Sequence, residues 1–113
     1  MFAAMEGVDA SPSMFGDGPG WWVNGKEIAH LEGGVLDLRL TRDEIRSRRD
    51  ELRADDRITL RSGTSDWIDV SVVDLALVTR LAEVAAAVHR APQGVTPKAP
   101  PTGRELERRR RFH

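Results

Sequence analysis

Apolar and polar residues alternate in several short segments of the chain, and the first two predict a β-hairpin. Residues 21–23 and 26–31 flank Asn24-Gly25, a dipeptide that accepts the positive φ angles of a two-residue type I′ turn. Because successive side chains of a strand point to opposite faces, the second segment has two predicted faces. One face carries Glu27, Ala29 and Leu31, and the other carries Ile28 and His30.

Three further segments show the same alternation. Residues 35–40 follow a glycine-rich turn, and residues 57–61 and 66–71 flank a Ser-Gly-Thr-Ser turn that predicts a second hairpin. The predicted inward residues are Leu36, Leu38, Leu40, Ile58, Leu60, Ile68 and Val70. The residues predicted to point away from the core are Asp37, Arg39, Trp67 and Asp69.

Two segments have the three-to-four-residue period of helices. The first, residues 41–53, opens with Thr-Arg-Asp-Glu, which is a capping box, and its few apolar residues predict a surface helix. The second opens at Ser71 and ends near Arg90, where Pro92 stops it. Its apolar stripe consists of Val73, Leu77, Leu81, Val84 and Val88.

The element order predicts an α+β domain over residues 19–91. We expect an antiparallel sheet of about five strands, in the order β-β-β-α-β-β-α, with two helices on one face. Residues 1–18 and residues 92–113 lack any apolar period, and we expect both to be disordered, the second as a proline-rich basic tail. A domain of this size buries only about 60% of the surface of its unfolded chain, so a homodimer is one expectation.

The charge distribution and the composition limit the kinds of function that this chain can have. The formal charge of −1 divides into −3 for residues 1–18, −2 for residues 19–90 and +4 for residues 91–113, so the tail can bind a polyanion or fold back on its own domain. The absence of cysteine excludes disulfides and thiol chemistry. We find neither a secretory signal nor an apolar run long enough to span a membrane, and we therefore predict a cytoplasmic protein with no membrane partner.

The sequence contains no recognisable catalytic constellation. It has neither a phosphate-binding glycine loop nor a nucleophile elbow, and its three histidines are too scattered for a zinc motif. His30 and Asp37 are the best acid–base candidates, but a hydrogen-bonded structural histidine and a solvated carboxylate are the favoured explanations. We therefore predict no catalytic residue, no metal and no cofactor.

Aromatic and basic residues give two binding hypotheses. Trp21 and Trp22 are adjacent in a strand, so one of them can face outward, and with Trp67 they are the predicted partner-binding residues. Four arginines on the first helix form a stripe about 60° wide that could follow phosphates, although a solvated helix with internal ion pairs explains it too. The predicted polyanion-binding residues are Arg42, Arg46, Arg49 and Arg53 on the helix, and Arg108, Arg109, Arg110 and Arg111 in the tail.

Two stretches, "NGKEIAHLEGGVLDLRLTRDEIRSRRDEL" and "SDWIDVSVVDLALVTRLAEVAAAV", resemble the luciferase-domain family of small, largely uncharacterised bacterial and fungal proteins. The resemblance covers about 65 residues and implies neither light production nor any catalytic residue. The layout is also similar to that of double-wing proteins, some of which are proposed to bind DNA. The matching positions are Glu27, Ile28, His30, Gly33, Leu36, Asp37, Trp67, Ile68 and Asp74.

The leading functional hypothesis is a small non-enzymatic domain that binds another protein, or a second copy of itself, through the sheet and the tryptophans. The alternative is binding of nucleic acid or another polyanion through the arginine stripe and the basic tail. An enzyme that uses His30 and Asp37 is the third hypothesis.

Overall fold

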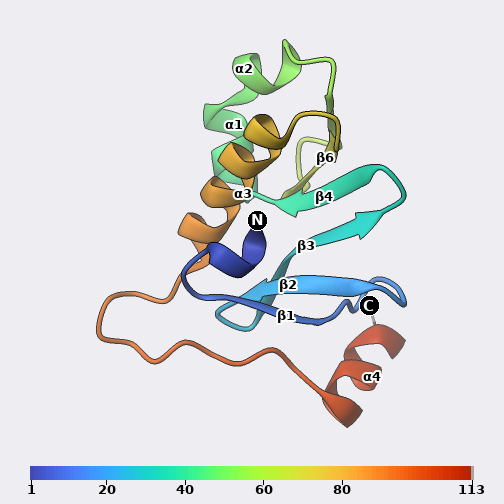
Figure 1. Cartoon of the computed structure of the whole chain (residues 1–113), viewed down its shortest axis with the longest axis vertical. Coiled ribbons are helices and arrows are strands. Elements are labelled where there is room, and N and C mark those ends of the chain that lie inside the picture. The colour runs from blue at the N-terminus through green and yellow to red at the C-terminus, as the bar shows by residue number, and fades with distance from the viewer. Residues whose placement is uncertain (113) are drawn as a thin grey trace.

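The computed structural model describes residues 1–112 and confirms the α+β class (Figure 1). Six strands form one open sheet in the order β1-β2-β3-β4-β6-β5, and all neighbouring strands are antiparallel. The strands are β1 (Val8–Pro12), β2 (Pro19–Val23), β3 (Lys26–Glu32), β4 (Val35–Arg39), β5 (Ile58–Leu60) and β6 (Trp67–Ser71). The helices are η1 (Phe2–Ala4), α1 (Arg42–Ser47), α2 (Arg49–Arg53), α3 (Leu75–His89) and α4 (Gly103–Arg111).

Local chemistry accounts for the central elements. Asn24 and Gly25 have φ angles of 50° and 78°, as the predicted hairpin turn requires. Leu38 pairs with Ala29 on one side and with Ile68 on the other, and this register lines up apolar side chains on one face of the sheet. α3 covers that face and buries Leu77, Val78, Leu81, Ala82, Ala85 and Ala86 in the main core.

Two helix boundaries differ from the expectation. The predicted helix over residues 41–53 is divided into α1 and α2 by Arg48, whose φ and ψ of −111° and 12° are not helical. Half of the predicted capping box of α1 is present, because the Glu44 N–H donates to Thr41 Oγ1 at 3.3 Å. The reciprocal half is absent, since the Glu44 carboxylate accepts from Arg48 Nε and the Thr41 N–H donates to the Asp66 carbonyl oxygen. α3 starts after Asp74 rather than at Ser71, since Asp74 Oδ1 accepts the first free amides of the helix at 2.9 and 3.3 Å.

The N-terminal segment, expected to be disordered, supplies the sixth strand. β1 pairs along its whole length with β2, and Phe2 is buried with its ring stacked 4.7 Å from that of Trp21. β1 is an edge strand without a buried residue, so backbone hydrogen bonds hold it and no apolar period marks it in the sequence. The structured domain therefore extends to the start of the chain.

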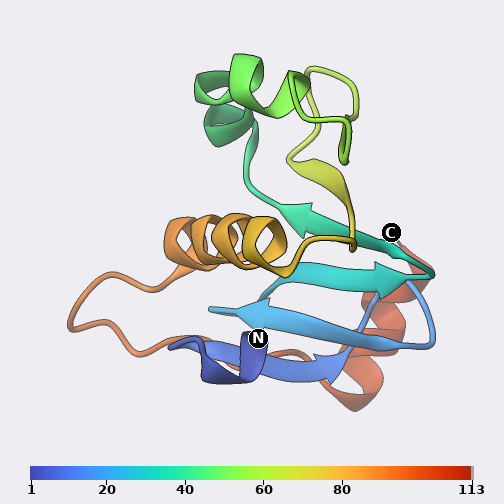
Figure 2. The ribbon, with the colours of Figure 1, turned by 45° about the horizontal axis from the view of Figure 1, so that its top comes forward.

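The tail also differs from the expected disorder, because it forms α4 on the opposite side of the sheet from α3 (Figure 2). Leu106 is buried, and the Arg110 guanidinium donates to the carbonyl oxygens of Ser13 and Gly16. The connecting segment is held where the Lys98 N–H donates to Asn24 Oδ1 at 2.9 Å. Within residues 1–112, no helix combines the length and the apolar character needed to cross a membrane.

Candidate functional site

The face of the sheet that α3 leaves uncovered carries a row of titratable side chains. Asp37 lies in the middle of β4, and the strand register pairs it with His30 of β3 and with Asp69 of β6. Both aspartates were predicted to point away from the core, and they do, but neither is a freely solvated charge. Asp37 is buried, and Asp69 is half-buried.

A β-bulge adds Glu27 to this row. Trp21 pairs with Ala29, but Trp22 pairs with Glu27, so β3 contains one extra residue at this point. Ile28 and Ala29 therefore both join the main core, and Glu27 lies within contact distance of His30. The predicted alternation, with Glu27 and His30 on opposite faces, is wrong for this reason.

His30 lies between two carboxylates. Its Nε2 atom is 2.7 Å from Asp37 Oδ2, and its Nδ1 atom is 3.2 Å from Glu27 Oε2. The Nδ1 contact is close but poorly directed for a hydrogen bond, and it is therefore mainly electrostatic. Arg61 completes the row from the far side, with its guanidinium 3.3 Å from Asp37 Oδ1 and 2.7 Å from Asp69 Oδ1.

Glu27 connects the row to the loop between β1 and β2. Its carboxylate is only 2% exposed, and it accepts hydrogen bonds from Ser13 Oγ at 2.5 Å and from the Met14 N–H at 2.8 Å. Gly20 leaves room for this carboxylate, since a Cβ atom there would lie 2.9 Å from Glu27 Oε2. The loop of residues 13–18 is thus held against the cluster by a buried carboxyl group.

The surroundings shift the pKa values of the cluster. Burial alone lowers the pKa of His30, but the neighbouring Glu27 and Asp37 outweigh it, and the pKa is raised above 6.5. Burial, followed by the hydrogen bond and charge of Asp69, raises the pKa of Asp37 to about 6. Burial also disfavours the charge on Asp69, yet Asp37 and Arg61 lower its pKa overall. As the pH falls below neutral, the aspartate pair therefore takes up its first proton on Asp37, near pH 6.

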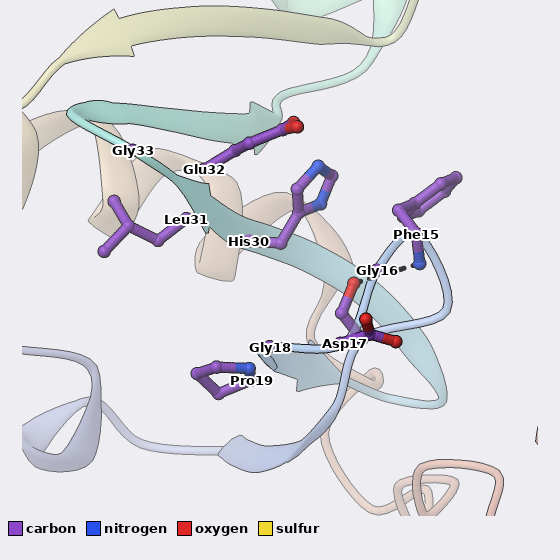
Figure 3. Close-up of a pocket in the computed structure, with 10 residues that line it drawn as sticks. Phe15, Gly16, Asp17, Gly18, Pro19, His30, Leu31, Glu32 and Gly33 are labelled. Atoms are coloured by element: carbon purple, nitrogen blue, oxygen red, sulfur yellow. Dashed lines mark hydrogen bonds between the residues drawn. The ribbon is translucent and has the colours of Figure 1, made fainter.

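Aromatic rings cover the imidazole. Phe15 lies 5.0 Å from the His30 ring and 5.4 Å from the Trp67 ring, and Arg39 lies over Trp67 at 4.7 Å. Figure 3 shows His30 rising from β3 beside the loop that carries Phe15 and Asp17. A hollow of about 300 Å³ lies between this loop and the end of β3.

The two ring nitrogens of His30 both point toward groups of the protein itself. Both ring nitrogens of His30 face carboxylates, so neither presents a free lone pair to the hollow. The sequence analysis named His30 and Asp37 as acid–base candidates, and the structure brings the two side chains together. They belong to a network of charged groups that connects β3, β4 and β6 with the loop of residues 13–18. Within residues 1–112, no group of three or more histidine, aspartate or glutamate side chains is arranged to hold a metal ion.

The three tryptophans occupy different environments. Trp22 is fully buried, so it cannot be the partner-binding residue that the sequence predicted. Trp67 is half-buried in the polar cluster, between His30 and Arg39. Trp21 is half-buried against Phe2 at the border of an apolar groove, and it is the one of the three that lies beside an exposed apolar surface.

The apolar groove is a feature that the sequence prediction missed. It has a volume of about 320 Å³, and it lies where the middle of β2, the end of β3 and the start of β4 meet the start of α3 and the N-terminal residues. Leu31 and Leu75 are 48% and 70% exposed there. The lining residues are Met1, Phe2, Ala3, Trp21, Leu31, Leu36, Val72, Leu75 and Val78.

The predicted arginine stripe is not continuous. The break at Arg48 separates Arg42 and Arg46 on α1 from Arg49 and Arg53 on α2. Arg49 is half-buried, and its Nε atom is buried without a hydrogen-bond partner among the described residues, whereas the other three are exposed. The stripe therefore does not form one straight basic face.

The arginine side chains of the tail point in different directions. Arg110 points into the molecule, toward Ser13 and Gly16, and Arg109 pairs with Glu105 at 3.0 Å. Arg108 and Arg111 are exposed, and the structure places Arg104, which the prediction did not include, beside them.

Comparison of the chain with protein-family models, with curated proteins and with solved structures found no match.

Proposed function

We propose that this chain is a non-enzymatic binding domain that recognises a protein partner through the apolar groove beside Trp21. The supporting observation is that exposed apolar side chains from three separate parts of the chain, residues 1–3, 31 and 72–75, gather around one hollow beside the half-buried Trp21. Soluble domains rarely expose such contiguous apolar surface unless it contacts another molecule. Scattered apolar residues would need no explanation, but these lie side by side.

The chemistry of the lining indicates the kind of partner. All nine lining side chains are apolar, so the groove offers no charge or amide to orient a polar ligand. An amphipathic helix or an extended segment can fill such a groove with two or three apolar side chains. Trp21 is well placed as an anchor, because a half-buried tryptophan is held by its own domain and still presents contact area.

The polar cluster supports a binding function rather than catalysis. His30 uses both nitrogens within the domain, and Glu27 uses its carboxylate to hold the loop of residues 13–18. These contacts stiffen the sheet from the face opposite the groove. A rigid scaffold lowers the entropy lost when a partner is bound. The cytoplasmic location remains a prediction from the sequence.

Leu75→Asp tests the groove, with Val95→Asp as the matched control. Both positions are exposed, at 70% and 55%, and Val95 lies outside the groove. Aspartate is tolerated at residue 75, because it would sit in the first turn of α3. A photo-crosslinking residue placed at Leu31 is expected to give a protein adduct in cells that Leu75→Asp abolishes and Val95→Asp leaves unchanged.

The same variants separate a foreign partner from a second copy. Sedimentation of the purified chain across a concentration series shows whether the adduct partner is the chain itself. If the chain forms a dimer that Leu75→Asp dissociates, the partner at the groove is a second copy of the chain and not a different protein. A monomer that gives no adduct sensitive to Leu75→Asp would contradict the proposed function.

A further inference from the structure

The C-terminal helix α4 is attached by one side only. With 100° between successive residues of a helix, Leu106 and Arg110 lie on the same side of α4. Leu106 is buried, and Arg110 donates to the carbonyl oxygens of Ser13 and Gly16. These two residues determine which side of α4 faces the domain.

The opposite side of α4 carries unpaired arginines. Arg104, Arg108 and Arg111 fall within an arc of about 60° that points away from the attachment side. All three are exposed, and none has an ion-pair partner within residues 1–112. Like charges spaced three and four residues apart destabilise a helix by a few tenths of a kcal/mol per pair. An anionic ligand would remove this repulsion.

An aromatic ring lies beside these arginines. Phe112 ends α4 and is 79% exposed. It lines a shallow hollow of about 490 Å³ together with Arg104, Glu107, Arg108 and Arg111. Glu107 is the single acidic side chain of that lining. Cations next to an exposed ring match a strand of phosphates whose bases are free to stack.

We propose that the outer face of α4, formed by Arg104, Arg108, Arg111 and Phe112, binds single-stranded nucleic acid. The arginines contact phosphates, and Phe112 stacks on a base. This surface is separate from the apolar groove, since the two share no residue. It also differs from the predicted stripe on α1 and α2, which is interrupted at Arg48 and has acidic neighbours such as Asp43 and Asp50.

The test is fluorescence anisotropy of the full chain with a labelled oligothymidylate of about 20 nucleotides, across a salt series. Each phosphate contact to a single strand contributes a slope of about −0.7 to the plot of log affinity against log salt concentration. Changing Arg104, Arg108 and Arg111 together to glutamine is expected to weaken binding roughly tenfold or more and to reduce the slope by about 2. Changing Arg42, Arg46 and Arg53 to glutamine removes the same charge from α1 and α2, and it is expected to leave affinity within about twofold.

Two further variants separate nucleic acid from polyanions in general. Phe112→Ala is expected to weaken binding of the oligonucleotide but not of heparin, which has no bases to stack. Glu107→Gln is expected to strengthen binding of both ligands, because it removes the acidic group from the hollow. Circular dichroism of each variant checks that α4 remains helical.

Three results would overturn the proposal. The first is an absence of oligonucleotide binding at low salt, and the second is an equal loss of affinity in the two triple-arginine variants. The third is an effect of Phe112→Ala on affinity that is the same for heparin and for the oligonucleotide.

Discussion

The position of His30 between two carboxylates makes a quantitative prediction about His30→Gln. The side chain is 14% exposed, and its removal leaves Asp37 with the Arg61 guanidinium, 3.3 Å away, as its remaining cation. Glu27 keeps only the neutral donors on Ser13 and Met14. Breaking one side of a buried ion pair commonly costs 3–5 kcal/mol, and glutamine restores part of the hydrogen bonding, so we expect a loss of about 3 kcal/mol in the free energy of unfolding.

The effect of His30→Gln depends on pH in a defined direction. The pKa of His30 is raised above its ordinary value of 6.5 in the folded protein. The stability that the charged imidazole supplies is therefore fully present below pH 6.5, and it is lost as the pH rises through the folded pKa. Asp37, with a pKa of about 6, becomes protonated at lower pH and then no longer forms an ion pair with the imidazolium. We therefore expect the difference in stability between the wild-type protein and the variant to be largest near pH 6.5 and to shrink toward pH 8.5.

Urea unfolding followed by tryptophan fluorescence measures this difference. With a slope of roughly 2 kcal/mol per molar urea, the midpoint should fall by about 1.5 M near pH 6.5. His89→Gln is the matched control, because burial lowers the pKa of His89. A depressed histidine pKa supplies stability above pH 6.5 that is lost as the pH falls, so the effect of His89→Gln should grow with pH. A difference for His30→Gln that is constant or increases from pH 6.5 to 8.5 would refute a charged His30 in the cluster.

Two further variants test how the loop of residues 13–18 is held. Gly20→Ala places a Cβ atom 2.9 Å from Glu27 Oε2, and we expect it to lower the free energy of unfolding by about 1–3 kcal/mol. Gly16→Ala, which meets no atom within 4 Å, is the control and should have no comparable effect in the same urea titration. Leu106→Ala removes the buried apolar anchor of α4, and the Met14 amide should then exchange its hydrogen at least about tenfold faster by mass spectrometry. Unchanged exchange at Met14 would show that α4 does not hold the loop.

The local pattern of the sequence determined the central hairpins, the Thr41 cap of α1 and the middle of the apolar stripe of α3. The predicted ends of that stripe, Val73 and Val88, are exposed. Asn24-Gly25 has few backbone alternatives, and the alternation through Leu36 and Leu38 leaves one register in which the apolar side chains share a face. These features depend on neighbours within a few residues. They could be predicted because short-range sterics and hydrogen bonding decide them.

Only the tertiary structure decided the remaining features. The bulge at Ile28 arises because Glu27 finds its hydrogen-bond donors in a loop fourteen residues earlier in the chain, and no period within the strand records that partner. β1 is held by backbone pairing with β2, to which side-chain patterns contribute little. α4 has a single buried apolar residue, so its docking depends on Leu106 and on carbonyl oxygens nearly a hundred residues away in the sequence. The apolar groove has the same origin, because its lining residues come from separate segments that meet only when the sheet and α3 have packed.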